Sequence, residues 1–232
     1  MRVYSYPVIF FDLDDTLTNK DANTLWIKWR AKHERWALVE GLLALLSLYR
    51  AYKKGKITHG RLSQYYRTKA YGLTVDEYQE RVEQFFLERG RMHIYPQAAS
   101  LLFAYRQNDC ELVLITAADD VMARAYGEAL GIDHVLSNRL DVQDDRIVGL
   151  QKPLCYGHGK VKLARQFLEE RGLDFKHCAF YTDSHADLPL LREVAQPVVL
   201  NPNPRLKEIA EQQGWPCLDW REEPEPKKRK KS

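Results

Sequence analysis

The chain has 232 residues, of which 45% are hydrophobic and 29% are charged. These values are typical of one large globular domain, or of one domain with an insertion, and exclude collagen-like, coiled-coil and largely disordered chains. Five consecutive basic residues at 227–231 account for the net charge of +3; without them the charge is −2, so no specific nucleic-acid partner is expected. The four cysteines stand singly, which excludes a CxxC motif and favours a reduced, cytoplasmic protein.

The first predicted element is a buried strand. Residues 8–11 are consecutively apolar, and a polar turn that contains Asp12, Asp14, Asp15 and Thr16 follows at once. A continuous apolar run of this length is typical of a central parallel strand that is covered on both faces. Residues 1–7 lead straight into this strand, so we expect no secretory signal peptide.

The segment 20–93 is predicted to be helical. It contains no proline, and its apolar residues recur at helical spacing. Thr74 followed by Glu77 predicts a capping box at the start of its last helix. The most apolar window, residues 36–49, contains Glu40 and is shorter than the ~20 residues that span a bilayer, so no transmembrane segment is predicted.

From residue 95 onward, helices and strands alternate. Such alternation predicts a parallel sheet flanked by helices, so we expect an α/β, Rossmann-like three-layer core with a helical cap inserted after the first strand. The expected division is a core of residues 1–19 and 94–220, a cap of residues 20–93 and a flexible basic tail of residues 221–232. The predicted helices are 98–107, 121–130, 160–170 and 188–194, the strands are 112–115, 135–136, 179–181 and 198–200, and 140–148 is a hairpin.

Polar residues gather where the predicted strands end. Ligands of parallel α/β sheets bind beyond the carboxyl ends of the strands, where the strand order reverses. Four short motifs occur there in order along the chain. They are DxDxT (Asp12, Asp14, Thr16), a threonine at a strand end (Thr116), a lysine at a helix start (Lys160 in GHGKV) and DxxxD (Asp183, Asp187). Buried carboxylates are costly without partners, and a divalent cation together with a lysine would offset that cost.

This set of motifs resembles that of the haloacid dehalogenase superfamily, and within it the subfamily IB, with a helical cap, that includes phosphoserine phosphatase. The resemblance covers nearly the whole chain. It implies a Mg²⁺-dependent phosphatase that hydrolyses a small phosphate monoester. Asp12 is then the nucleophile that forms an aspartyl-phosphate, and Asp14 protonates the leaving group and later deprotonates the attacking water.

The same resemblance implies roles for the remaining motif residues. The metal ligands are Asp12, the Asp14 backbone carbonyl and Asp183, because Mg²⁺ prefers hard oxygen donors. Thr116 and Lys160 hold the phosphoryl group, and Asp187 orients Lys160 or a metal-bound water, or ligates the metal directly.

Two further residues each have two candidate roles. Thr16 either contacts the phosphate or bonds to nearby backbone. Asp21 either meets an amine of the substrate or caps the first helix of the insertion. Arg61 and Arg67 are candidates for binding a carboxylate of the substrate.

The sequence is also compatible with three different functions. The apolar stretch 37–49, with Trp26, Trp29 and Trp36 nearby, indicates packing inside the cap, a dimer contact or a peripheral membrane surface for a lipid head-group phosphatase. The other two alternative functions are a phosphotransferase and a non-catalytic phosphate-binding module. A binding module, however, has no need of the nucleophile Asp12. The basic tail either stays solvated or touches RNA or anionic lipid. We expect a monomer or a homodimer.

Overall fold

The structure is a computed structural model that describes residues 3–33, 46, 49–50, 70 and 72–221. The helices of this part are α1 (Ala22–His33), α4 (Val75–Glu88), α5 (Pro96–Arg106), α6 (Asp120–Leu130), α7 (His158–Glu169), α8 (Leu188–Leu191) and α9 (Pro204–Gln213), with 3₁₀ turns at Gly90–His93, Phe175–His177 and His185–Asp187. The strands are β1 (Val8–Phe11), β2 (Glu111–Asp119), β3 (His134–Asn138), β4 (Leu140–Gln143), β5 (Arg146–Leu150), β6 (Cys178–Thr182), β7 (Gln196–Leu200) and β8 (Cys217–Leu218).

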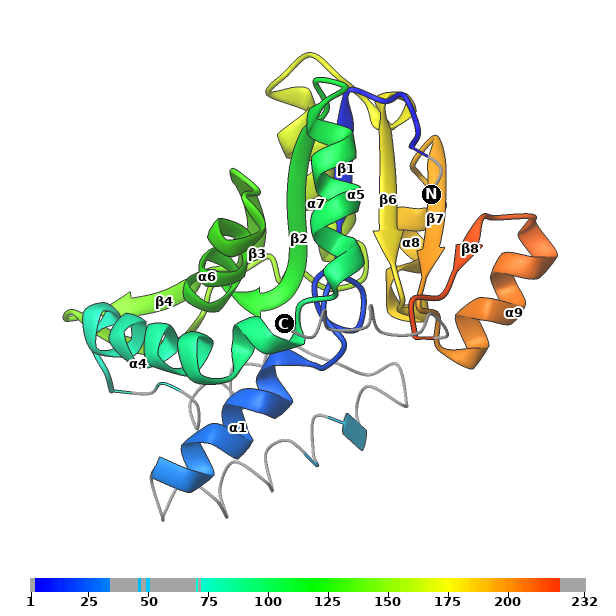
Figure 1. Cartoon of the computed structure of the whole chain (residues 1–232). Helices are drawn as coiled ribbons and strands as arrows, with labels where there is room; N and C mark the ends of the chain where they lie inside the picture. The colour runs from blue at the N-terminus through cyan, green and yellow to red at the C-terminus, as the bar shows by residue number, and fades with distance from the viewer. Residues whose placement is uncertain (1–2, 34–45, 47–48, 51–69, 71, 222–232) are drawn as a thin grey trace.

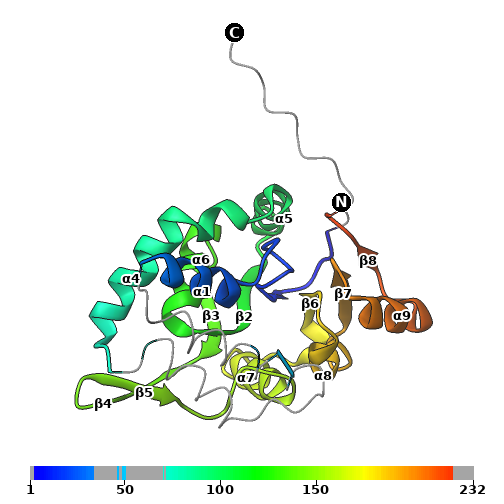
Figure 2. The ribbon, with the colours of Figure 1, turned by 90° about the horizontal axis from the view of Figure 1, so that it is seen from below.

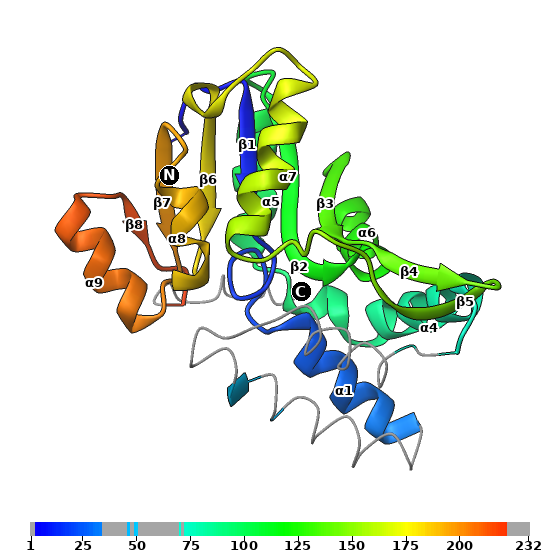
Figure 3. The ribbon, with the colours of Figure 1, turned by 180° about the vertical axis from the view of Figure 1, so that it is seen from behind.

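Six strands form one parallel sheet in the order β3-β2-β1-β6-β7-β8, and β4 and β5 form a separate antiparallel hairpin (Figure 1). Successive residues of β1 point to opposite faces, so Ile9 and Phe11 join one apolar cluster and Val8 and Phe10 join the other. Helices α5 and α6 lie on one face of the sheet and α7 and α8 on the other, while α4 lies beside α6 near the β4–β5 hairpin (Figures 2 and 3). The predicted α/β three-layer fold is therefore confirmed.

The chain leaves the sheet and returns to it through two paired segments. Thr18 forms an antiparallel bridge with Ile94, and hydrogen bonds run from Asn19 N to His93 O (2.8 Å) and from Tyr95 N to Leu17 O (2.9 Å). These bonds lie at the predicted junctions of the inserted segment 20–93. The division into core and cap stays a prediction, because much of that segment, with Trp36, Arg61 and Arg67, lies outside the described residues, as does the tail after residue 221.

The helix α4 is fastened to the core. Its predicted capping box is present, since Thr74 Oγ1 accepts from Glu77 N (3.1 Å) and Glu77 Oε2 accepts from Thr74 N (2.9 Å). The buried Tyr78 hydroxyl donates to Asp119 Oδ2 (2.9 Å) at the end of β2. The described end of the inserted segment is thus bonded to the strand that carries Thr116.

Two of the three tryptophans near the apolar stretch lie inside the molecule. Trp26 is fully buried and Trp29 is 6% exposed, and their rings stack at 5.4 Å and pack against Phe85 of α4. The rings of Trp26 and Trp29 fill the space between α1 and α4, so these two residues do not form part of a membrane surface. The apolar stretch 37–49, apart from Leu46 and Tyr49, lies outside the described residues, so its role stays a prediction. Among the described residues, no helix is long and apolar enough to cross a membrane.

Candidate active site

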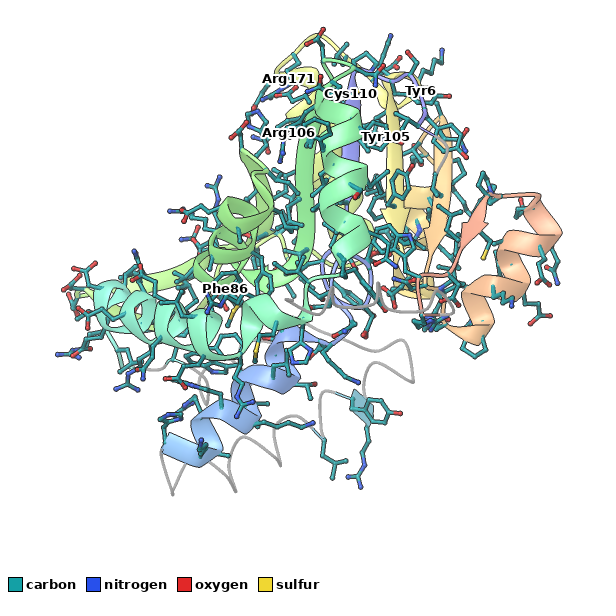
Figure 4. All side chains as sticks on the ribbon, viewed as in Figure 1. Tyr6, Phe86, Tyr105, Arg106, Cys110 and Arg171 are labelled. Atoms are coloured by element: carbon teal, nitrogen blue, oxygen red, sulfur yellow. The ribbon has the colours of Figure 1, made fainter. Side chains whose placement is uncertain are left out.

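The loop after β1 lies at the centre of the sheet edge. Phe11 is in register with Leu114 of β2 and Tyr181 of β6, and Asp12 N donates to Tyr181 O (2.9 Å). Asp12 and Asp183 therefore directly follow β1 and β6, and Thr116, which is still within β2, lies within two residues of the same level. This edge faces α1 (Figure 1), whereas Arg171 and Cys110 lie at the opposite end of the sheet (Figure 4).

A buried lysine joins two of the predicted site residues. Lys160 Nζ donates to Asp12 Oδ1 (2.7 Å) and to Asp187 Oδ2 (2.8 Å), and the Thr182 hydroxyl donates to the same Asp187 oxygen (2.8 Å). The side chains of Lys160 and Asp187 are 3% and 2% exposed. Because both ion pairs are shielded from water, Lys160 is fixed beside the predicted nucleophile.

The start of α7 brings Lys160 to this position. Gly157 at the N-cap has φ +53°, a conformation that side chains rarely adopt. A Cβ on Gly159 would lie 1.7 Å from Leu154 O, so only glycine lets the loop approach the helix this closely. Lys160 is one residue further, in the first turn of α7.

The electrostatics of Asp12 and Lys160 are coupled. The pKa of Asp12 is raised to about 6, chiefly by burial and also by the negative charge of Asp187, against the opposing charge of Lys160. Burial alone would lower the pKa of Lys160, but the charges of Asp12 and Asp187 outweigh it and raise that pKa. Lys160 is therefore a permanent cation at this site.

The carboxylates of Asp14 and Asp21 both accept hydrogen bonds from backbone N–H groups in the first turn of α1. Asp14 Oδ1 accepts from Ala22 N (2.7 Å), and Asp21 Oδ1 accepts from Thr24 N (2.6 Å). Asp21 is thus the N-cap of α1, which was one of its two predicted roles. Burial, and then the negative charge of Asp21, raise the pKa of Asp14 well above its usual value, which favours the protonated form that a general acid needs.

Asp183 is tied to the first motif. Thr16 Oγ1 accepts from Asp183 N (2.9 Å) and donates to Asp183 Oδ1 (3.3 Å), so the structural role of Thr16 is observed and a phosphate contact stays a prediction. Burial and the charges of Asp12 and Asp15 raise the pKa of Asp183. Asn201, at the end of β7, donates to Asp15 O (3.2 Å) and Thr16 O (3.1 Å) and accepts from Trp220 N (2.7 Å).

The donor set at this edge fits Mg²⁺. No group of three or more His, Cys, Asp or Glu side chains suited to a metal is found in the described part of the chain. The predicted set needs only two carboxylates, Asp12 and Asp183, and the Asp14 carbonyl, because Mg²⁺ keeps several waters. Mutual repulsion contributes to the raised carboxyl pKa values here, and a divalent cation would relieve it.

Thr116 lies inside β2 and is 1% exposed. Its Oγ1 accepts from Ala118 N (3.1 Å), within an irregular stretch of the β2–β3 pairing between Ile115 and Asp119. The hydroxyl hydrogen remains available to a phosphoryl oxygen, and that contact stays a prediction.

Hydrogen bonds join Asp12, Lys160 and Asp187 directly, and join Asp183 to Thr16; Asp14 and Asp21 lie side by side at α1. No role was predicted for Thr182, Asn201 or Asn138, three buried polar residues at strand ends. For Thr182 and Asn201, their position directly after apolar strand residues was the available signal; Asn138 follows Ser137 and had no such signal.

Comparisons with known proteins agree with this architecture. Residues 9–192 match the haloacid dehalogenase-like hydrolase family. A histidinol-phosphatase of Neisseria meningitidis is 28% identical over 217 residues, which cover 91% of this chain and 97% of that protein. The phosphoserine phosphatase SerB1 of Mycobacterium tuberculosis is 33% identical over 109 residues, 47% of this chain and 35% of its own. Two further Mycobacterium tuberculosis relatives are 32% identical, and the match spans 44% of their length.

The solved structures show the same fold. A Bordetella pertussis protein of unknown function superposes with a TM-score of 0.78 and 25% identity, over 93% of this chain and 99% of that chain. A substrate-bound phosphoserine phosphatase superposes with a TM-score of 0.65 and 17% identity, over 95% and 97%. The chain belongs to the haloacid dehalogenase-like hydrolase family. The predicted family and the predicted enzyme class, a hydrolase, are confirmed.

Proposed function

We propose that this protein is a Mg²⁺-dependent phosphatase that hydrolyses a small phosphate monoester through an aspartyl-phosphate on Asp12. One observation carries the proposal: the buried Lys160 bonds to Asp12 at the end of β1, next to Asp14, a carboxyl whose pKa is raised. Relatives named as phosphatases support the same reaction.

In the first step, a carboxylate oxygen of Asp12 attacks phosphorus and the bond to the leaving oxygen breaks. Asp14 donates its proton to that oxygen, so the leaving group departs as a neutral alcohol. Lys160 and Thr116 donate hydrogen bonds to the phosphoryl oxygens. A magnesium ion, held by Asp12, the Asp14 carbonyl and Asp183, would neutralise the phosphate charge.

In the second step, Asp14 takes a proton from a water, which attacks phosphorus and releases inorganic phosphate. The Asp12 carboxylate is thereby restored and Asp14 is again protonated. Asp14 accepts the hydrogen bond from Ala22 N at Oδ1, so within the described residues Oδ2 is the oxygen left for both proton transfers.

Hydrolysis of p-nitrophenyl phosphate, with Mg²⁺ and with a chelator, tests the reaction. We expect release only with Mg²⁺, and a loss of about a thousandfold or more in Asp12→Asn. Asp133→Asn, at an exposed loop position, is the matched control and should be unchanged. Acid-quenched wild type should carry one added phosphoryl mass that Asp12→Asn lacks. Full activity in Asp12→Asn would contradict the proposal.

We further propose that the leaving group carries an amine that faces Asp21. Asp21 is beside Asp14, the residue that protonates the leaving oxygen. The substrates named for two relatives, histidinol phosphate and phosphoserine, both bear an amine. Because Asp21 also caps α1, Asp21→Asn is the informative variant: asparagine keeps the cap to Thr24 and removes the charge.

A panel of phosphate esters with and without amines tests this substrate class. Asp21→Asn should lose about tenfold in kcat/KM for amine-bearing esters and keep its rate on p-nitrophenyl phosphate. An unchanged preference in Asp21→Asn would remove the amine from the proposal. Adding glycerol as acceptor would reveal a phosphotransferase as a new phosphoester.

The cytoplasmic location is part of the proposal. All four cysteines lie in the described residues and none forms a disulfide, as is usual for proteins of a reducing compartment.

A further inference from the structure

Asn138 is a fully buried asparagine at the end of β3, and no motif of the sequence includes it. Its Nδ2 donates to Ala117 O (2.6 Å), and its Oδ1 accepts from Cys155 N (2.8 Å). Both ends of the amide are therefore used. They connect two segments that are 38 residues apart in the sequence, the end of β2 and the loop before α7.

On the side of β2, Asn138 completes an interrupted ladder. The regular pairing of β2 with β3 runs to Ile115 and resumes only at Asp119, which is opposite Asn138. Between these points, the Asn138 side chain donates a hydrogen bond to the carbonyl of Ala117, the residue that follows Thr116. The backbone that carries Thr116 is thus fixed by an amide side chain where strand pairing is irregular.

On the other side, the backbone from Cys155 to Lys160 is tightly folded. Tyr156 O accepts from Gly159 N (2.9 Å) and Gly157 O accepts from Lys160 N (3.1 Å). Leu154 O lies so close to Gly159 that a Cβ there would be 1.7 Å from it, so the loop before α7 is packed directly against the first turn of the helix. A displacement of Cys155 would therefore reach Lys160.

We propose that Asn138 is a positioning residue that fixes Thr116 relative to Lys160, the two donors that hold the phosphoryl group. The inference rests on the proposed function and adds to it a residue that contacts neither substrate nor metal. Substitution of Asn138 would leave the carbonyl of Ala117 and the N–H of Cys155 buried without a hydrogen-bond partner. Misplacement of catalytic donors by about 1 Å can lower the rate about a hundredfold.

The test is a double-mutant cycle in hydrolysis of p-nitrophenyl phosphate with Mg²⁺. Asn138→Ala should lower kcat/KM about tenfold or more, and Thr116→Ala should lower it as well. Because Asn138 acts partly through Thr116, the double variant should lose clearly less than the product of the two single losses. Asn108→Ala, which removes an exposed amide bonded to Ala104 O (2.8 Å), is the control and should be unchanged.

A stability effect is separated from positioning by two readouts. Thermal melting identifies variants that are folded at the assay temperature, and the inhibition constant of inorganic phosphate reports the phosphoryl site itself. We expect weaker phosphate inhibition in Asn138→Ala but not in Asn108→Ala. If Asn138→Ala does not fold, Asn138→Ser, which keeps one hydrogen-bonding group, replaces it. Asn138→Ser should show a smaller loss of kcat/KM and a smaller weakening of phosphate inhibition.

Folded Asn138 variants with unchanged kcat/KM and phosphate inhibition would overturn the inference, as would losses that multiply fully with Thr116→Ala. In either case, Asp12→Asn in the same assay still reports on the proposed function. Wild type that hydrolyses nothing overturns both.

Discussion

Lys160 is the buried cation between Asp12 and Asp187, and its environment determines what its removal would do. Both carboxylates bond to it, at 2.7 and 2.8 Å, within a site shielded from water. Removing one partner of a buried pair leaves an uncompensated charge, which is far more costly than replacing the whole pair. Under the proposed function, Lys160 therefore contributes both to stability and to the reaction, and the two contributions can be measured separately.

Lys160→Met should lower the free energy of unfolding by about 3 kcal/mol, because Asp12 and Asp187 then repel each other without a cation. Adding Asp187→Asn should restore part of that stability in urea unfolding. Hydrolysis should stay at least about a hundredfold reduced in both variants, since the phosphoryl group has lost a donor. Recovery of activity in the double variant would contradict the role of Lys160 at the phosphoryl group.

The start of α7 shows how an element carries a functional residue. The helix begins after Gly157, and the contact between Leu154 and Gly159 fixes where its first turn lies. A side chain at 159 must push the loop and the helix apart, and Lys160 would move with the helix.

Gly159→Ala should therefore lower both the melting temperature and kcat/KM, the stability by about 1–3 kcal/mol. Gly172→Ala is the matched control, after the same helix: it has φ +66° and no atom within 4 Å of an added Cβ. That variant should lose about 1 kcal/mol from backbone strain and keep its hydrolysis rate. Equal loss of activity in the two variants would mean that helix stability, rather than the position of Lys160, is responsible.

Across the molecule, the six-stranded sheet gathers carboxylates from β1 and β6 at one edge. The pKa of Asp12 rises from 3.8 to about 6, chiefly through burial, and those of Asp14 and Asp183 rise too. Between these values the folded protein binds more protons than the unfolded chain. The contribution of Asp12 to stability is thus complete below about pH 4 and is lost as the pH rises through about 6, and the raised pKa values of Asp14 and Asp183 act in the same direction.

Without metal, the protein should melt at a lower temperature at about pH 7.5 than at about pH 5.5. Mg²⁺ should raise the melting temperature more at the higher pH, where the carboxylates are ionised. The pH dependence should shrink in Asp12→Asn, whose amide does not titrate. A metal-free melting temperature that is equal at the two pH values, or an equal effect of Mg²⁺ at both, would count against the charge balance described for this site.

Much of the fold was predictable, because buried parallel strands have continuous apolar runs and their helices have clear periodicity. The exceptions have local causes. Strand β2 extends to Asp119 through Ala117 and Ala118, two residues without strand preference, because β3 pairs with its end. Strand β8 has two residues and is defined by its bonds to β7, and α9 begins at Asn203 and Pro204 without a strong apolar stripe. Helix α8 ends at Leu191, earlier than predicted.

The motif residues were predictable as a set because chemistry restricts their types and spacing. Their supporting partners were not: Asn138 and Asn201 resemble ordinary turn formers, and their bonding partners are 17–186 residues away. Whether Asp21 caps a helix could be decided only from the hydrogen bond to Thr24. Long-range hydrogen bonds of buried amides leave no periodic trace in a sequence.

The bridge between Thr18 and Ile94 has an evolutionary consequence. The hydrogen bonds around it keep the two ends of the inserted segment together, whatever sequence connects them. If segment 20–93 is the predicted cap, recombination or insertion at this junction would exchange most of it while Asp12 and Lys160 keep their places. New selectivity can then arise in one part of the gene without disturbing the reaction centre encoded by the other.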